Sequence, residues 1–455
     1  MEHTRNLATF CAELTFSSLP ADVVHKAKLC LLDYVANIYG SLELSAVSQV
    51  IDHVRSLGDG NAATALGCGF KTNLLQAAFI NGTLAEAIEA QDGVRFGGNH
   101  PGAAVIPAAM GIAEQLHLDG KAMIGAIVAG YEAANRPAAA MHPWHTLSGF
   151  LPTGTCGAFG AAAAAGYLYG FGPEKMLHAI GNAGYLLPLS MAEHLMAGCT
   201  IKIVQGGQAA SAGILAAGLA GNGLTGSTQV LEGSALKGGF TQITTRAEPK
   251  VEKISDNLGK SFSIMDVYFK PYTACRHTHG AAQAVLGLLE ETPIAADMVE
   301  RIDVYTYGIA QLAVGKSVDA GSSFVSAQFS IPYVVAACLL DRALGPGQLT
   351  EKRMTDPAIM DLSKTVRVHT DDELNRRYPD VTASRVAVTM KDGRCCERQI
   401  DIPKGDPRDP MTAGDIAEKV RFFAGNRNPD TIDEVIRMIL KLETVTDMAD
   451  IATRI

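Results

Sequence analysis

The feature that most restricts the fold of this chain is a set of long tracts built from alanine and glycine. Two of them, GAFGAAAAAG beginning at Gly157 and QGGQAASAG beginning at Gln205, contain few bulky side chains. Of the 455 residues, 47% are hydrophobic but only 6% are aromatic. Helices of this composition approach one another closely and are buried on several sides. We therefore expect a core of closely packed helices.

The pattern of apolar residues divides the chain into a helical region and a mixed region. The first two-thirds predicts helices at 23–39, 46–57, 73–80, 84–89, 121–136, after Pro152, 174–187 and 201–221. Alternation of apolar and polar residues then predicts strands at 300–307, 365–369, 384–390 and 394–402, with helices at 281–291 and 328–344. The tail, residues 412–442, is expected to be helical again.

These elements predict a mainly α protein with two domains, as its length also suggests. A large all-helical domain would comprise residues 1–268 and 404–455. A smaller α+β domain, residues 269–403, would be inserted before the C-terminal helices, with PKGDPRDP at 403–410 as the connector.

Charge and composition exclude several classes of function. The net charge is −9 and no basic run is present, which argues against binding of nucleic acid. No signal-peptide pattern begins the sequence, and the most apolar tract, near residues 159–170, is too short to span a membrane. The nine cysteines form no CxxC pair and indicate reduced thiols in a cytoplasmic protein. No GxGxxG or P-loop motif precedes a helix, so we expect no nucleotide cofactor.

The stretch that begins at Asp92 is expected to be a tight loop between two helices. It contains Arg95 and Gly97-Gly98 and ends at His100-Pro101. Proline is favoured in the first turn of a helix, so His100 would lie beside unpaired backbone N–H groups. Asp92 and His100 would then face each other across a small anion, as a proton-transfer site requires. The alternative is a capping histidine and a turn aspartate without a chemical role.

Other parts of the sequence offer groups for binding an anion. The glycine-rich helix start at 149–160 exposes backbone N–H groups, although glycine there also serves close packing. Lys202 begins an otherwise apolar helix, where a buried lysine needs an anionic partner or a lowered pKa.

The segment FKPYTACRHTHG, residues 269–280, places cationic and imidazole groups at the junction of the two expected domains. These are Lys270, Arg276, His277 and His279, and clefts between domains are common ligand sites. The His-x-His pair lacks further spaced ligands, so we expect no metal. Tyr333, in AQFSIPYVV, is by composition a core residue.

The order of these motifs resembles that of the MmgE/PrpD family over nearly the whole chain. The matching stretches are NGTLAEAIEAQD, NHPGAAVIPAAM, AIVAGYEAANR, GFLPTGTCGAFGAAAAAG, IKIVQGGQAASAG, LEG at 231–233, FKPYTACRHTHG and AQFSIPYVVAACLL. That family includes 2-methylcitrate dehydratases, cis-aconitate decarboxylase and iminodisuccinate epimerase. The resemblance implies a large helical domain with a smaller α+β lid, an active site between them, a homodimer and no obligatory cofactor.

The resemblance also implies the roles of individual residues. Asp92 and His100 would be the acid/base pair. Lys202 and Lys270 would hold substrate carboxylates, with Lys270 counted among the catalytic groups. The remaining substrate-binding residues would be Arg95 and Arg276, with His279 and Tyr333 lining the cleft from the lid. Proton transfer beside a carboxylate needs such a set of acids, bases and cations.

Three departures from the family pattern leave the reaction open. The family often has a doubled acidic run near DFDD, where this chain has EAQDG with one aspartate. Its GFHPTG motif has Leu151 here, and its K-x-L-H-x-G motif has Gln205 in place of the histidine. Leu151 cannot transfer a proton, so His142 or His145 would have to substitute.

We consider three functions for the chain. The first is a hydro-lyase resembling 2-methylcitrate dehydratase, acting on a small hydroxy-di- or tricarboxylate. The second is a decarboxylase or an epimerase (isomerase) of a related polycarboxylate. The third is a non-catalytic member that binds a carboxylate, an option that the missing imidazoles favour. In each case the partners would be a small polycarboxylate and a second copy of the chain, without nucleic acid or membrane.

Overall fold

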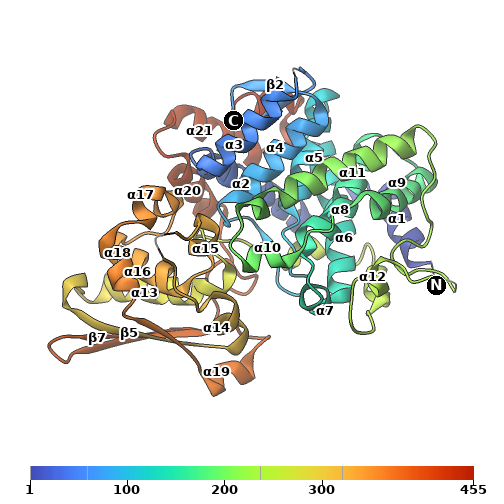
Figure 1. The fold of residues 1–455 in the computed structure, drawn as a ribbon. Helices are drawn as coiled ribbons and strands as arrows, with labels where there is room; N and C mark the ends of the chain where they lie inside the picture. Colours follow the sequence, from blue (N-terminus) through green and yellow to red (C-terminus); the bar gives the residue numbers. More distant parts are fainter. Residues whose placement is uncertain (1, 59, 236, 320) are drawn as a thin grey trace.

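The alanine-rich tracts form two helices that pack directly against each other at the centre of the larger part of the molecule (Figure 1). In a computed structural model, which describes residues 2–58, 60–235, 237–319 and 321–455, these are α8 (Pro152–Leu168) and α11 (Gln205–Gly221). A Cβ atom on Gly213 of α11 would lie 2.6 Å from the backbone nitrogen of Ala162 in α8. Only small residues permit backbones to approach this closely.

Further helices surround this pair and build a single hydrophobic core. In chain order they are α1 (His3–Glu13), α2 (Ala21–Ser41), α3 (Ser45–Ser56), α4 (Leu74–Ala87), α5 (Gly102–Gln115), α6 (Gly120–Met141), α7 (Trp144–Leu147), α9 (Pro173–Leu186), α10 (Ala192–Met196) and α12 (Phe240–Ile243). A 3-10 turn, η2 (Thr200–Val204), precedes α11. Two short antiparallel ribbons are also present, β1 (Ala63–Ala65) with β2 (Phe70–Thr72) and β3 (Gly93–Val94) with β4 (Val267–Tyr268).

A second hydrophobic core, built from residues between Ala274 and Met390, lies at the lower left of Figure 1; we call the strands and helices around it the α+β part. Its four-stranded sheet has the order β6-β5-β7-β8, in which only the β5–β6 pair is parallel. The strands are β5 (Val299–Thr306), β6 (Val366–Thr370), β7 (Ser384–Met390) and β8 (Cys395–Ile400). The helices are α13 (His279–Glu291), α14 (Gly308–Val314), α15 (Phe324–Gln328), α16 (Ile331–Asp341), α17 (Glu351–Met354), α18 (Pro357–Ser363) and α19 (Asp372–Arg377).

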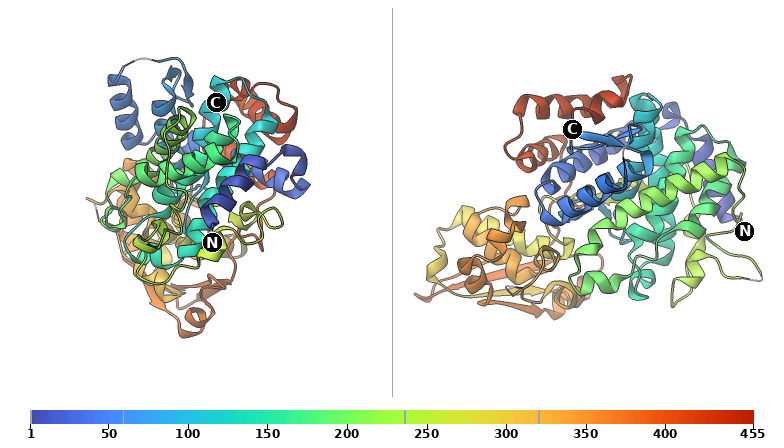
Figure 2. Two further views of the ribbon diagram at one scale, coloured as in Figure 1. Left: turned by 90° about the vertical axis from the view of Figure 1, so that its right-hand side faces the viewer. Right: turned by 45° about the horizontal axis from the view of Figure 1, so that its top comes forward.

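The C-terminal helices return to the larger part. They are α20 (Ala413–Ala424), α21 (Pro429–Leu440) and α22 (Ala449–Ala452), and Figure 2 shows them in red beside the blue N-terminal helices. Lys419 of α20 donates hydrogen bonds to Asp33 of α2 at 2.7 Å and to the carbonyl oxygen of Ala90 at 2.6 Å. The end of the chain therefore holds the backbone just before Asp92.

The mainly α class predicted from the sequence is confirmed. The helices expected at 73–80 and 84–89 are wrong in one respect, since the structure has the single helix α4. Residues 81–83, left between the two expected helices, are helical, and Gly82 allows α11 to approach, because a Cβ atom there would lie 2.5 Å from the Cα atom of Gly207. The two short ribbons depart from an all-helical domain, and the domain boundaries at 268/269 and 403/404 stay predictions.

Among the described residues, one helical stretch, Thr200–Gly221, is long and apolar enough to cross a membrane. Most of its apolar window is buried inside the protein, where it contacts α4, α8 and α9. A central helix of a packed core has the same composition as a membrane span.

The contact between α4 and α11 predicts opposite effects for two glycines of the same helix. A Cβ atom on Gly207 would lie 2.1 Å from the carbonyl oxygen of Phe79, so Gly207→Ala should lower the free energy of unfolding by about 1–3 kcal/mol. A Cβ atom on Gly218 would meet no other atom within 4 Å, so Gly218→Ala should raise it by up to about 1 kcal/mol. Urea denaturation of both variants checks this, and equal effects would contradict the packing described.

Candidate active site

Asp92 follows α4 and turns its carboxylate into the start of α5. Its Oδ1 accepts a hydrogen bond from the backbone N–H of Gly102 at 3.1 Å, and its Oδ2 accepts one from the Tyr131 hydroxyl at 2.6 Å. Burial raises the pKa of Asp92 to about 7, although the Tyr131 hydrogen bond opposes this shift. Asp92 is therefore a carboxyl group that gains or loses its proton near neutral pH.

His100 lies at the other end of the same loop, directly before α5. Its Nδ1 is 2.6 Å from the carbonyl oxygen of Asp92, and a carbonyl can only accept, so Nδ1 carries the proton. This leaves the lone pair on Nε2. Burial lowers the pKa of His100 to about 3, and the positive charge of Lys270 adds to the effect. The imidazole is thus neutral at pH 7 and presents Nε2 as a proton acceptor.

The expectation that the side chains of Asp92 and His100 face each other is not met in this structure. The imidazole contacts the Asp92 backbone, while the Asp92 carboxylate bonds to Gly102 and Tyr131. The reason is local, because the first turn of a helix leaves N–H groups without partners and a preceding carboxylate readily caps them. The loop still brings both residues to one place, where β3 pairs with β4.

A buried cluster of two lysines and two glutamates lies beside this loop. Glu89 receives Lys202 on its Oε2 and Lys270 on its Oε1, the latter at 2.6 Å. Lys202 also contacts the Oε1 of Glu86 at 2.8 Å. Lys270 donates a second hydrogen bond to the Glu89 carbonyl oxygen at 3.1 Å. The structure therefore joins α4, η2 and the segment after β4 through four charged side chains.

The two glutamates differ in their pKa, although they lie one turn apart. Burial raises the pKa of Glu86. Burial would also raise the pKa of Glu89, but the charges of Lys202 and Lys270 outweigh it and hold that pKa well below its usual range. Burial would lower the pKa of Lys202, but the charges of the same two glutamates outweigh it and raise that pKa. Glu89 is thus the permanent anion of the cluster.

Neither Glu86 nor Glu89 was predicted as a site residue from the sequence. In the sequence both stand in LAEAIEA, where every other residue is apolar; in the structure Glu86 lies in the last turn of α4, and Glu89 lies just beyond its end with a φ of 54°. Acidic side chains in such a run are rarely buried without a cationic partner. That signal, together with the need of Lys202 for an anionic partner, is enough to suggest the ion pair.

Two of the expected substrate-binding residues instead hold the parts of the chain together. Arg95 donates to the carbonyl oxygens of Pro379 and Asp380, both at 2.7 Å. Arg276 donates to the carbonyl oxygens of Pro403 and Lys404, also at 2.7 Å. Each guanidinium group is engaged by protein backbone in this structure.

His279 and Tyr333 occupy different surroundings. His279 is fully buried, and its Nε2 donates to the Ala274 carbonyl oxygen at 2.9 Å. Burial and the charge of Arg276 lower the pKa of His279. Tyr333 belongs to the second hydrophobic core, and its hydroxyl donates to the carbonyl oxygen of Gln348. The structure thus places Tyr333 where composition alone predicts, within a core and bonded away from the lysine cluster.

The two histidines considered as replacements for an imidazole at position 151 also differ. His145 is buried and has both nitrogens engaged, Nδ1 by Thr244 and Nε2 by Thr155 at 2.8 Å. Burial lowers its pKa to about 4. His142 lies closer to the loop that follows Asp92, since its ring meets that of Phe96 edge-on. Only His142 retains a ring nitrogen, Nδ1, without a partner among the described residues.

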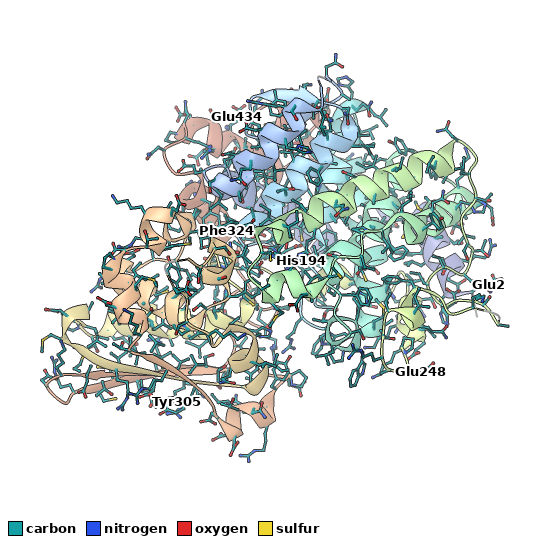
Figure 3. The ribbon with its side chains drawn as sticks, in the orientation of Figure 1. Glu2, His194, Glu248, Tyr305, Phe324 and Glu434 are labelled. Carbon is teal, nitrogen blue, oxygen red and sulfur yellow. The ribbon has the colours of Figure 1, made fainter. Side chains whose placement is uncertain are left out.

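The α+β part makes direct contacts with this region. Gln328 of α15 donates to the carbonyl oxygen of Ala87 at 2.8 Å, and Ser323 hydrogen-bonds to that of Gly198 at 2.5 Å. Figure 3 shows this junction, where His194 of α10 and Phe324 of α15 are labelled near each other. The lysine cluster is consequently shielded from solvent, and Lys270 is 0% exposed.

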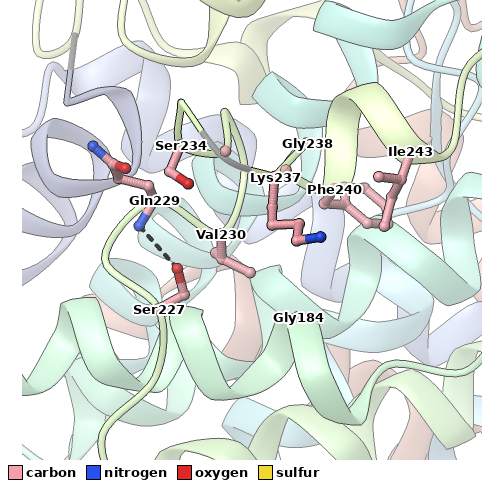
Figure 4. A pocket seen from close by; sticks show the side chains of 11 residues that line it. Gly184, Ser227, Gln229, Val230, Ser234, Lys237, Gly238, Phe240 and Ile243 are labelled. Carbon is pink, nitrogen blue, oxygen red and sulfur yellow. Dashed lines mark hydrogen bonds between the residues drawn. The ribbon is translucent and has the colours of Figure 1, made fainter.

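A separate hollow lies between α9 and α12 (Figure 4). Its cavity volume is about 240 Å³, and its lining includes Ser227, Gln229, Lys237, Phe240 and Ile243. None of the residues predicted for the site lines it.

Comparison with known proteins matches nearly the whole chain. A model of the MmgE/PrpD N-terminal domain matches residues 5–252, and one of the MmgE/PrpD C-terminal domain matches residues 272–443. The cis-aconitate decarboxylase of Aspergillus terreus is 26% identical over 98% of this chain and 94% of its own length. The human cis-aconitate decarboxylase is 27% identical over 83% of this chain and 78% of its own length. The mouse cis-aconitate decarboxylase is 25% identical over 98% of this chain and 91% of its own length.

The raised pKa of Asp92 predicts a specific dependence of stability on pH. Between pH 3.8, the ordinary pKa of an aspartate, and about pH 7, the folded protein retains a proton on Asp92 that the unfolded chain releases. The stability that this proton contributes is therefore present at low pH and is lost as the pH rises through about 7. The asparagine of Asp92→Asn cannot titrate. The free energy of unfolding of this variant relative to the wild type should therefore be about 2–3 kcal/mol higher at about pH 8 than at about pH 5.

The measurement is urea denaturation of both proteins at the two pH values. Asp119→Asn, which alters an exposed N-cap of α6, is the control and should follow the wild type. If the free energies of unfolding of Asp92→Asn and the wild type differ by the same amount at both pH values, Asp92 is ionised at both.

Proposed function

Because the chain belongs to the MmgE/PrpD family, we propose that it is a cofactor-independent lyase that decarboxylates a small unsaturated polycarboxylate, with cis-aconitate as the first substrate to test. The observation that carries this proposal is the buried meeting of Lys202, Lys270 and Glu89 beside the neutral imidazole of His100. The names of the curated relatives support decarboxylation as the reaction.

The lysines retain the capacity to bind substrate carboxylates. An ammonium group has three N–H donors. The contacts of Lys202 with Glu86 and Glu89 use two of them, and so do the contacts of Lys270 with the Oε1 and carbonyl oxygens of Glu89. One donor on each lysine is available for a carboxylate. Charge-assisted hydrogen bonds of this kind, formed in a site without water, fix an anion strongly.

Decarboxylation breaks a carbon–carbon bond and leaves an electron pair on a carbon next to the remaining carboxylates. The two ammonium groups would offset the charge that develops there. The carbon must then receive a proton, and Nε2 of His100 is the atom that would carry it. Substrate carboxylates would offset the repulsion from Lys270 and so raise the pKa of His100 from about 3 towards neutrality.

Dehydration of a hydroxy-polycarboxylate, as in 2-methylcitrate dehydratases, is the second candidate. It is favoured by Asp92, whose pKa of about 7 suits an acid that protonates a departing hydroxyl group. In this structure that proton would have to pass Tyr131 or the backbone of Gly102, which engage both carboxyl oxygens. This arrangement supports decarboxylation as the first reaction to test.

We also propose that residues 269–403 act as a lid. Every charged group of the lysine cluster is buried, so a substrate enters only if the α+β part moves away. The contacts that would break include those from Arg95 to Pro379 and Asp380 and that from Gln328 to Ala87. Apolar contacts would also break, since Phe324 and Val325 of α15 pack into the hydrophobic core of the helical part.

A second copy of the chain is the proposed partner. Exposed apolar side chains gather where the loop after α7 runs beside the segment before α10, joined by the bridge between Phe150 and Met191. Leu147 is 54% exposed and Leu189 is 61% exposed, and Trp144 and Met191 are also exposed. Exposed apolar side chains on neighbouring segments are typical of an interface between subunits.

The proposed reaction predicts loss of turnover in a variant of the imidazole. Purified protein incubated with cis-aconitate should release carbon dioxide, and His100→Asn should reduce kcat by about 10²–10⁴-fold, because no side chain then transfers the proton. His117→Asn, an exposed histidine at the end of α5, is the matched control and should retain activity. Formation of an unsaturated product from 2-methylcitrate without gas release would instead indicate dehydration.

The proposed interface predicts a change in mass in solution. Leu147→Glu combined with Leu189→Glu should convert a dimer to a monomer, because two charges on each copy would be buried in the interface. Light scattering after gel filtration measures the mass. Leu312→Glu in α14, where the side chain is 66% exposed, is the control. A monomeric wild type, or a dimeric double variant, would exclude this interface.

A further inference from the structure

Glu86 is satisfied at one carboxyl oxygen and not at the other. Its Oε1 accepts from Lys202 Nζ at 2.8 Å and from Gln205 Nε2 at 2.7 Å. Its Oε2 is buried without a hydrogen-bond partner in the described part of the chain. An ionised carboxylate with one bare oxygen is costly to bury, and a protonated carboxyl group much less so.

Glu89 competes with Glu86 for the same cation. Lys202 contacts both glutamates, but Glu89 alone also has Lys270, so Glu89 retains its charge and Glu86 faces a like charge one turn away. When two carboxyl groups share a site, their different environments push their pKa values apart, so that one group stays protonated and the other ionised.

The neighbouring elements add few other charges around Glu86. Lys202 comes from η2, and α11 contributes the uncharged Gln205, whose Oε1 is 3.2 Å from the Ser190 hydroxyl. His100 contributes to lowering the pKa of Glu89. Asp33 of α2 is paired with Lys419 of α20, and its charge contributes to raising the pKa of Asp92.

We propose that Glu86 carries a proton in the form of the enzyme that binds an anionic substrate, so that this proton sets the affinity of the site. The inference rests on the proposed function, because it takes Lys202 and Lys270 as the groups that bind substrate carboxylates. A proton from solvent forms an O–H bond at Oε2, and no other bond changes. Once Glu86 is neutral, the charge of Lys202 acts on the substrate, whereas an ionised Glu86 repels it. Glu86 is thus a positioning residue that acts through Lys202.

The experiment uses propane-1,2,3-tricarboxylate, a polycarboxylate with neither a double bond nor a hydroxyl group. Its dissociation constant is measured by titration calorimetry over the whole pH range in which the protein stays folded, first with the wild type. Binding to the wild type should weaken by up to about tenfold per pH unit as Glu86 ionises. Glu86→Gln resembles the protonated acid in shape and does not ionise, so its dissociation constant should not vary with pH.

Two controls separate Glu86 from other groups. Glu114→Gln alters another buried glutamate, which contacts Thr64 and Lys71 away from the cluster, and should keep the wild-type dependence. Asp92→Asn and His100→Asn test the two other groups of the site whose protonation could be linked to binding. A dependence that survives in Glu86→Gln and disappears in either of these variants would overturn the inference, and so would a wild type whose affinity does not change with pH.

A further measurement avoids reliance on the folding of Glu86→Gln. The titration is repeated in buffers of different ionisation enthalpy with the wild type and with His100→Asn, which removes any uptake on the imidazole. Net uptake of protons on binding that His100→Asn retains supports the inference, and no uptake at any pH overturns it. Turnover of cis-aconitate is assayed separately. Proton-linked binding without turnover would refute the decarboxylase and leave the inference intact. Turnover together with binding that is independent of pH would support the decarboxylase and refute the inference about Glu86.

Discussion

The buried contact of Lys202 and Lys270 with Glu89 is the interaction on which the site depends. It joins a helix, the start of another helix and the entry to the α+β part, which are far apart in the sequence. Burying these charges is costly, and only good geometry with several hydrogen bonds offsets the cost. The close approach of α4 to α11 through Gly82 and Gly207 supplies that geometry. The small residues that define the core thus also position the cations.

Much of the architecture could be predicted from the sequence because it follows from local patterns. Alternation at 384–390 and 394–402 predicted a hairpin, and it is present as β7 and β8. His100-Pro101 predicted a helix start, and α5 begins at Gly102. The prediction that failed, a break within α4, arose because Gly82 has a role in packing between helices, which a local rule cannot detect.

The site was harder to predict because its decisive contacts are not local. Lys202 was identified as a cation in need of a partner and Lys270 as a cation at the domain junction, but their shared partner Glu89 lies more than a hundred residues away along the chain. Asp92 and His100 were placed on one loop, whereas the direction of each side chain depends on Tyr131 and on the capping of α5. Residue type and spacing therefore indicated which groups assemble, but tertiary contacts decide what each of them touches.

The hydrogen bonds of Lys419 have a consequence for how the protein is made. During synthesis on the ribosome, α2 and the loop at Ala90 emerge more than three hundred residues before α20. Until α20 is made, Asp33 lacks its cation, and a buried carboxylate without one opposes compaction of the surrounding helices. A chain terminated before α20 would therefore leave Asp33 without its ion pair and the carbonyl oxygen of Ala90 without its donor.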